Sequence, residues 1–288
     1  MSLLQLAVMS GCVVFALITV MAAAWRIQEA SGNSGWVDVS WTFGVGGVAF
    51  LAALARLAQE AAEEAAQGAA PEPWPHWRQI VVAGLVAVWS LRLGLHIVAR
   101  TRAAGDDPRY RQLVVEWQSN ASRRMFWFLQ AQAMVGVVLV ISVVLAAQNG
   151  NPDLRIQDVL GIAILAAAIS GEAIADRQLR RFKADPSKQG AVCGIGLWRW
   201  SRHPNYFFEW LGWLAYPLIA IDSSGHNPYG WLALLAPACM YWVLVHVSGV
   251  PPLEDHMLRS RGDVFRAYQR RTRAFLPFPL IRQPGHRV

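Results

Sequence analysis

The sequence predicts an all-α membrane protein that crosses the bilayer seven times. Of its 288 residues, 55% are hydrophobic and only 16% carry a charge, a balance that soluble domains rarely show. Several apolar runs reach the roughly 20 residues that a helix needs to cross a bilayer. The expected spans are residues 3–25, 36–58, 79–99, 126–147, 156–176, 206–221 and 229–248, which form one domain over residues 1–288.

Three stretches of this pattern differ from a plain apolar span. The run 3–25 has no basic leader and no small-residue cleavage site, so we expect a retained span rather than a signal peptide. The segment 59–73 is rich in Ala, Glu and Gln, and we expect an acidic helical extension or external loop without chemistry. The run 206–221 is short, which favours a tilted helix or one that begins inside a polar cavity.

The basic residues alternate between the two sides of these spans. The connecting segments on one side hold 22 of the 26 Lys and Arg residues, and those on the other side hold only Arg78 and Arg155. The positive-inside rule therefore places the N-terminus outside and the C-terminus in the cytoplasm, with a bacterial inner membrane as the expected location. Because the net charge of +7 follows this topology, it does not imply nucleic acid.

Membrane lipid and a lipophilic small molecule are the expected partners, and no obligate protein partner is evident. The cysteines number three and are scattered, so neither a disulfide framework nor a metal site is expected.

Ionisable residues within the spans share one depth, in the cytoplasmic half of the expected bundle. They are Asp38 on the second span; Arg92, His96 and Arg100 on the third; Glu172 and Asp176 on the fifth, continuing to Arg180; and Glu209 with Trp213 on the sixth. Ionisable residues in membrane spans are candidates for function. A channel needs polar lining throughout, whereas here the outer half is apolar. The pattern therefore predicts a pocket that opens to the cytoplasm and has an apolar floor.

Each of these residues also has a structural interpretation. Arg100, Arg180 and Lys183 would serve equally as snorkelling anchors at the membrane surface. Asp38 would suit a helix start by compensating the helix dipole, and Trp213 would suit core packing. The acidic pair of the fifth span would fit an internal ion pair. The joint pattern at one depth favours the functional interpretation.

The most informative stretch joins a basic loop to the sixth span. It reads Arg202-His203-Pro204-Asn205-Tyr206, and Glu209 follows one turn later. Guanidinium groups recognise phosphate, and the N-terminal end of a helix attracts anions. Topology needs only Lys and Arg, so the neighbouring His, Asn, Tyr and Glu favour a binding site for an anionic molecule.

These motifs resemble those of one family over nearly the whole chain. The matching stretches are Asp38-Val39-Ser40-Trp41; Leu91-Arg92-Leu93; Gly105-Asp106-Asp107-Pro108-Arg109-Tyr110; Ala175-Asp176-Arg177-Gln178-Leu179-Arg180; Gly196-Leu197-Trp198; Ser201 to Tyr206 with Glu209; and Ser248-Gly249-Val250-Pro251. Together they closely resemble the steroid 5-alpha-reductase superfamily, and more narrowly its bacterial membrane branch of unknown function.

The resemblance implies a seven-helix fold that binds NADPH from the cytoplasmic side. It also implies reduction of a carbon–carbon double bond conjugated to a ketone in a steroid-like substrate. The residues expected at the cofactor are Arg100, Glu172, Asp176, Arg180, Lys183, Arg202, His203, Asn205, Tyr206, Glu209, Trp213, Glu254, His256, Tyr268 and Arg271. Trp41 and Arg92 are expected at the substrate.

The substrate side departs from the family pattern. Animal steroid reductases polarise the ketone with a Gln-Glu pair on the second helix and a Tyr on the third. Here the second span carries Asp38, and the third carries Ile97 beside His96 where that Tyr would fall. Negative charge develops on the ketone oxygen during hydride addition and needs a donor. The expected catalytic groups are therefore Asp38, protonated in an apolar pocket, and then His96.

A membrane methyltransferase is the alternative function. Isoprenylcysteine and phospholipid methyltransferases share an Arg-His-Pro element, a following Tyr and a Glu in the tail, and these bind S-adenosylmethionine. The cations from Arg177 to Lys183 favour the reductase, because a dinucleotide carries several phosphates and S-adenosylmethionine is itself cationic.

Overall fold

The computed structural model describes residues 1–55, 75–104 and 108–278, and these form two compact units. Unit 1 comprises Met1–Ile162 with Ala215–Ala236, and unit 2 comprises Ala163–Leu214 with Pro237–Val288. Within the described ranges every regular element is a helix, so the predicted all-α class is confirmed. The expected acidic segment 59–73 lies outside the described residues.

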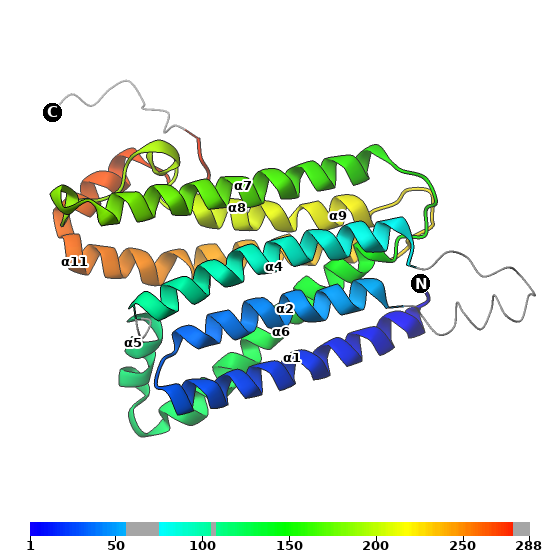
Figure 1. Ribbon diagram of the computed structural model, residues 1–288, viewed down its shortest axis with the longest axis horizontal. Helices are drawn as coiled ribbons and strands as arrows, with labels where there is room; N and C mark the ends of the chain where they lie inside the picture. The colour runs from blue at the N-terminus through cyan, green and yellow to red at the C-terminus, as the bar shows by residue number, and fades with distance from the viewer. Residues whose placement is uncertain (56–74, 105–107, 279–288) are drawn as a thin grey trace, which may run out of the picture. The chain divides into compact units, whose positions relative to one another are not determined.

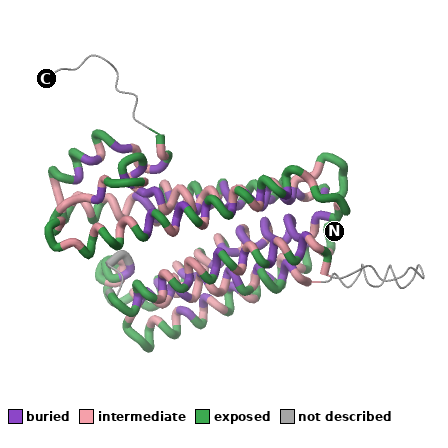
Figure 2. Tube along the Cα trace, turned by 45° about the horizontal axis from the view of Figure 1, so that its top comes forward, coloured by how far each residue is buried: buried purple, intermediate pink, exposed green. Residues whose placement is uncertain are grey.

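Unit 1 is built from long helices that lie side by side (Figure 1). They are α1 (Leu3–Ser31), α2 (Gly35–Leu54), α4 (Trp77–Ala104) and α6 (Ala121–Ala147), with α5 (Pro108–Trp117) and the short η1 (Gln118–Asn120) joining α4 to α6. Helix α2 packs against α1, α4 and α6, while α9 (Ala215–Ala220) and η4 (Gly230–Leu234) pack against α6. The buried positions follow the helix sides that face one another (Figure 2).

Local signals in the sequence define the first helix. Ser2 and Gln5 form a capping box, in which each side chain satisfies the backbone N–H of the other residue. Gly32 caps the C-terminal end of the helix. Its φ of 63° is a left-handed conformation, which glycine adopts readily. Helix α1 consequently runs six residues beyond the apolar stretch 3–25 predicted to lie in the membrane.

Glycines bring the helices of unit 1 into close contact. A Cβ atom at Gly46 on α2 would lie 2.1 Å from Ser90 Oγ on α4, so no larger residue fits without movement. Ser90 Oγ also donates a hydrogen bond to the Thr42 carbonyl at 3.2 Å. Small residues at helix contacts are typical of membrane bundles, where packing replaces the hydrophobic effect as the driving force.

Unit 2 contains most of α7 (Ile156–Ala184), with α8 (Pro204–Trp213), most of α10 (Leu235–Trp242), the π-helical turn η5 (Val243–Val247) and α11 (Val250–Arg271). The loop between α7 and α8 carries the short helices η2 (Pro186–Lys188) and η3 (Gly196–Arg199). Helix α8 runs alongside α7 (Figure 1), and a Cβ at Gly171 would meet the Phe208 ring at 2.4 Å. Helix α11 is kinked at Gly262, whose φ is 46°.

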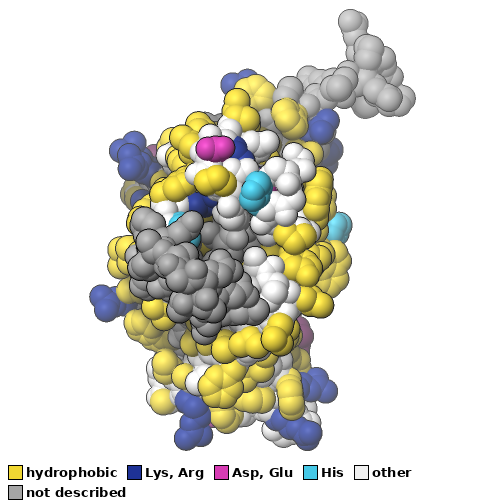
Figure 3. Space-filling model, turned by 90° about the vertical axis from the view of Figure 1, so that its right-hand side faces the viewer, with side chains coloured by type: hydrophobic (Ala, Val, Ile, Leu, Met, Phe, Trp, Pro, Cys, Tyr) yellow, Lys and Arg dark blue, Asp and Glu magenta, His cyan; other side chains and the backbone are white. Residues whose placement is uncertain are grey.

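Six of the described helical segments are long and apolar enough to cross a membrane. They are Leu3–Ser31, Gly35–Leu54, Trp77–Ala103, Tyr110–Ala147, Ile156–Ala184 and Gly230–Arg271. Hydrophobic side chains also cover much of the described surface in Figure 3. The chain is therefore a multi-pass membrane protein. The expected span 206–221 consists of α8 and α9, which are separated at Leu214 and are each short.

The contact at Gly46 predicts a difference between two adjacent glycines. Gly46→Ala should lower the stability of the purified protein by about 1–3 kcal/mol, because the added methyl group overpacks against Ser90. Gly47→Ala is the control, since nothing lies within 4 Å of a Cβ there, and it should be neutral or slightly stabilising. Thermal unfolding in detergent measures both. Equal effects of the two substitutions would contradict the close packing of α2 on α4.

Candidate functional site

A cluster in unit 1 centres on the carboxyl group of Asp38, in the first turn of α2. The Tyr110 hydroxyl donates a hydrogen bond to Asp38 Oδ1 at 2.7 Å, and Arg100 Nη2 lies 3.2 Å from Asp38 Oδ2. Tyr110 is buried, with 4% of its surface exposed, whereas the Asp38 side chain is 21% exposed. The buried Tyr110 hydroxyl is therefore held by the Asp38–Arg100 ion pair, whose side chains are partly exposed to solvent.

Two further residues fix the orientation of Tyr110. Gln132 Nε2 on α6 donates to the Tyr110 hydroxyl oxygen at 3.2 Å. Trp41 Nε1 on α2 donates in turn to the Gln132 carbonyl at 3.0 Å, and the Tyr110 ring meets Phe128 edge to face. Helices α2, α4, α5 and α6 thus converge on one hydroxyl group. Such a preorganised hydroxyl can stabilise charge on a neighbouring oxygen.

Sequence reasoning identified Asp38, Trp41 and Arg100 of this cluster but assigned no role to Tyr110. The search for a tyrosine on the third span found Ile97, which is buried in the core with 8% exposed. The structure supplies a tyrosine from α5 instead. The signal in the sequence was the tyrosine that closes the stretch Asp107-Pro108-Arg109-Tyr110, just after a helix-starting proline.

The other expected residues of the third span lie earlier on α4. Arg92 and His96 precede Arg100 at four-residue spacing on this helix, and both are half-buried. All three residues lie in one continuous helix, so their four-residue spacing places them on one face of it, as predicted.

A second cluster lies in unit 2, along α7 and the loop that follows it. Glu172 and Asp176 are buried on α7, whereas Arg180 and Lys183, one and two turns later, are exposed. The loop is fastened to α7 at two points: Trp198 Nε1 donates to the Ala175 carbonyl, and the Leu197 N–H donates to Gln178 Oε1 at 2.9 Å.

Helix α8 carries the expected Asn205, Tyr206, Glu209 and Trp213. Trp213 Nε1 donates to Glu209 Oε1 at 3.0 Å, so the two side chains, one turn apart, share one face of the helix as predicted. Both side chains are buried. Tyr206 stacks on the His203 ring with the two planes 9° apart. A buried carboxylate thus faces an indole at the start of an apolar helix.

The expected residues of the tail fall into an exposed and a buried group. Arg271 and His256 on α11 are exposed, and Arg271 lies over the Tyr268 ring. Tyr268 is buried with 2% exposed, and its hydroxyl donates to the Trp198 carbonyl. Glu254 is engaged by Arg202 and His203 at 2.7 and 3.0 Å. Among the residues expected at the cofactor, Arg180, Lys183 and Arg271 are exposed cations, and such groups suit phosphate recognition.

One pocket of about 310 Å³ lies elsewhere in unit 1, at the start of α6. Asn120, Arg123, Arg124 and Trp127 line it, and none of them was expected at a functional site. The functional interpretation therefore rests on the two side-chain clusters and not on this pocket.

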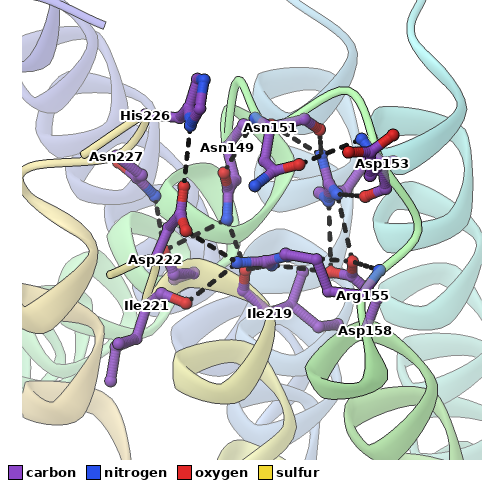
Figure 4. Close-up of polar contacts among 12 residues, drawn as sticks. Asn149, Asn151, Asp153, Arg155, Asp158, Ile219, Ile221, Asp222, His226 and Asn227 are labelled. Atoms are coloured by element: carbon purple, nitrogen blue, oxygen red, sulfur yellow. Dashed lines mark hydrogen bonds and ion pairs between the residues drawn. The ribbon is translucent and has the colours of Figure 1, made fainter. Parts of the chain in front are cut away.

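A third polar cluster, in unit 1, joins the start of α7 to neighbouring loops (Figure 4). The Arg78 guanidinium, which is 3% exposed, donates five hydrogen bonds: two to the Asp158 carboxylate and one each to the carbonyls of Asn149, Asn151 and Asp153. Every donor of this guanidinium is consumed. Arg78 therefore has no capacity for a ligand and holds the loop in place.

Arg155 completes this cluster (Figure 4). Its Nη2 donates to Asp158 Oδ1 at 2.8 Å and to the Ile219 carbonyl at 2.6 Å, and its Nη1 donates to the Ile221 carbonyl at 3.0 Å. The two arginines that sequence analysis placed opposite the basic side thus share one buried carboxylate. The arrangement is structural, because a buried ion pair needs this degree of hydrogen bonding to offset desolvation.

The fold defines a helical, multi-pass membrane protein. Within its described residues, the buried Tyr110 hydroxyl contacts a partly exposed ion pair, and exposed cations lie on α7 and α11. The chain belongs to the family described as protein of unknown function, DUF1295, which matches residues 24–272.

A similar protein is the uncharacterized protein C594.04c of Schizosaccharomyces pombe. It is 30% identical over 102 residues, which cover 34% of this chain. The match spans 27% of the yeast protein's length. No solved structure matches the chain significantly.

The structural cluster makes a prediction about acid stability. Burial alone would raise the pKa of Asp222, but hydrogen bonds from Ser224, the charge of Arg155 and a bond from Asn151 together lower this pKa from 3.8 to about 2. A lowered pKa stabilises the fold above the unfolded value and loses that effect as pH falls through the folded value. The contribution of Asp222 should therefore disappear between about pH 4 and pH 2.

Asp222→Asn should lower stability by about 1–3 kcal/mol at neutral pH, and the gap to the wild type should close below pH 4. Thermal unfolding from pH 7 to pH 2.5 measures it. Asp153→Asn in the same region is the control, because that side chain is exposed and should change stability little. A gap that stays constant over this pH range would contradict the assigned role.

Proposed function

We propose that this protein is an NADPH-dependent reductase of a carbon–carbon double bond conjugated to a ketone in a steroid-like, lipophilic molecule. The observation that carries the proposal is the buried Tyr110 hydroxyl, held 2.7 Å from Asp38 Oδ1 with Arg100 on the other carboxylate oxygen. The resemblance of the motifs to steroid 5-alpha-reductases supports the reaction class.

The donors of unit 2 fit a dinucleotide. Arg180, Lys183 and Arg271 are exposed cations suited to phosphate groups, and Asn205 offers an amide. The Glu209–Trp213 pair, joined by a 3.0 Å hydrogen bond, is buried on α8 and would support the cofactor site from within the fold. In the proposal these residues hold NADPH, and the bound cofactor supplies the hydride.

Tyr110 provides the electrophilic group of the proposed reaction. Hydride addition to the β carbon shifts the electron pair of the double bond towards the ketone oxygen. When the substrate binds, the single proton of the Tyr110 hydroxyl turns from Asp38 to that oxygen and stabilises its developing negative charge, and a proton from water completes the α carbon. The product is the saturated ketone.

Asp38 takes a positioning role in this scheme. In the structure its carboxylate accepts a hydrogen bond from the Tyr110 hydroxyl and forms an ion pair with Arg100. Asp38 therefore serves as an acceptor and not as a donor. The donor role that sequence reasoning gave to Asp38 therefore passes to Tyr110. Gln132 keeps the phenol oxygen in place from its other side. His96 remains a candidate donor from α4, and Trp41 and Arg92 remain candidates for the substrate.

The proposed topology has seven crossings in a bacterial inner membrane, with the C-terminus in the cytoplasm. The proposal adds one crossing to the six long apolar helical segments, namely the sixth expected span, residues 206–221, whose 16 residues would span about 24 Å as a helix. In this orientation the basic connecting segments face the cytoplasm, where NADPH is present. The distribution of Lys and Arg in the sequence supports this orientation.

Cofactor binding is the first test. NADPH at about 100 times its Kd should stabilise the native protein by about 2.7 kcal/mol, seen as a rise in Tm of several degrees. S-adenosylmethionine is the comparison ligand, and it should have no effect. Thermal unfolding in detergent with NADPH, NADH or S-adenosylmethionine makes the measurement. Stabilisation by S-adenosylmethionine alone would sink the reductase and favour the methyltransferase.

The role of Tyr110 is tested with a 3-oxo-4-ene steroid as substrate. Tyr110→Phe should lower kcat/KM by about 100- to 1,000-fold, because the oxyanion donor is lost, while NADPH binding stays unchanged. Tyr229→Phe removes the same atom elsewhere in unit 1 and should keep full activity. Asp38→Asn and His96→Ala rank the remaining candidates. Full activity of Tyr110→Phe would remove this residue from the mechanism.

A further inference from the structure

Arg202 was expected to bind the cofactor phosphates, but its guanidinium is already engaged within unit 2. Nε and Nη2 donate to the two oxygens of Glu254 at 2.7 and 3.0 Å, in a forked pair. Nη1 donates to the carbonyls of Thr272 and Gln269. The two charged side chains are only 12% and 13% exposed. This guanidinium has little capacity left for a phosphate.

The Glu254 carboxylate is equally well occupied. His203 Nε2 lies 3.0 Å from Oε1, and Gln269 Nε2 donates to Oε2 at 2.8 Å. With Arg202, these contacts balance the charge and satisfy the oxygens. Withdrawing either partner would leave an uncompensated charge in a mostly buried place, which is strongly unfavourable.

Backbone contacts beside this cluster hold the C-terminal segment. The Arg202 N–H donates to the Arg273 carbonyl at 2.8 Å, and Ser201 forms a parallel bridge with Arg273. Ser201 Oγ also donates to the Phe275 carbonyl at 2.8 Å. Phe275 is buried and packs its ring against Phe207 on α8. The start of α8 and the segment after α11 are thus joined by both side chains and backbone.

We propose that Arg202, His203 and Glu254 form a clasp that fastens residues 272–275 to the start of α8. The clasp itself does not contact phosphate. It affects nucleotide binding indirectly, by positioning exposed cations that are close to the clasp in the sequence, such as Arg271. The nucleotide part of this inference rests on the proposed function, whereas the fastening of the tail does not.

Glu254→Gln separates the two roles because it removes the charge that neutralises Arg202. A clasp predicts that trypsin cleaves after Arg270, Arg271 and Arg273 at least about tenfold faster, since local opening frees the backbone of this segment from its helical and bridge hydrogen bonds. It also predicts weaker NADPH binding with an unchanged dependence of Kd on salt. A phosphate contact predicts the opposite: tighter binding and a steeper salt dependence, because the guanidinium is released.

Three further variants complete the experiment. Asp255→Asn removes an exposed carboxylate from the neighbouring position and should leave cleavage unchanged. Arg271→Gln removes an exposed cation and should flatten the salt dependence of NADPH binding. Arg202→Lys keeps the charge but loses the fork, so it should speed cleavage as Glu254→Gln does.

The outcomes distinguish the clasp from the cofactor. Wild-type protein that fails to bind NADPH would overturn the proposed function, while the cleavage rates would still test the clasp. Wild-type cleavage rates in both Glu254→Gln and Arg202→Lys would overturn the clasp. Tighter NADPH binding by Glu254→Gln would return Arg202 to the phosphate site.

Discussion

The absence of water from the bilayer core is the constraint on which the structure depends. Backbone groups there must be satisfied within the chain, and helices achieve this locally. Charged side chains that are buried inside the protein, away from water, likewise need partners within the chain. Arg78 illustrates the extreme, with all five donors used by neighbouring acceptors. Burial together with full hydrogen bonding marks a structural cluster, whereas exposure to solvent marks a candidate binding site.

By this criterion the polar clusters divide into two kinds. The Arg78–Asp158–Arg155 cluster of unit 1 and the Arg202–Glu254 pair of unit 2 are saturated by protein partners. The Asp38–Tyr110–Arg100 cluster differs, because the side chains of Arg100 and Asp38 are 45% and 21% exposed. The cations of α7 and α11 that are expected at the cofactor are likewise exposed. The proposed reaction uses only the second kind.

The sequence was sufficient for the fold class and for the approximate position of most helices. Apolar length predicts where a helix can lie in the membrane, but it does not predict where the helix ends. Helix α7 continues through polar residues to Ala184, eight residues beyond the predicted span 156–176, because nothing there breaks it before Asp185 caps the next turn. Residues 206–221 divide into two helices at Leu214, and the hydropathy of this stretch does not predict the division.

The candidate site was predictable only in part. The pairing of Glu209 with Trp213 follows from helical spacing, and the structure has it. The contact of Tyr110 with Asp38 joins residues 72 positions apart and depends on where the helix after α4 packs. Local periodicity carries no such information. Likewise, Arg202 and Glu254 look like ligands in a motif, and only their mutual contact shows that they satisfy each other.

The central claim is hydride transfer to an enone, and isotope transfer tests it most directly. The purified protein would be given NADPH deuterated at the transferring position of the nicotinamide together with a 3-oxo-4-ene steroid, and the product would be analysed by mass spectrometry. We predict a saturated ketone with one deuterium at the β carbon, formed by the wild type and greatly reduced in Tyr110→Phe. A wild-type protein that binds NADPH yet yields no deuterated product would contradict the account.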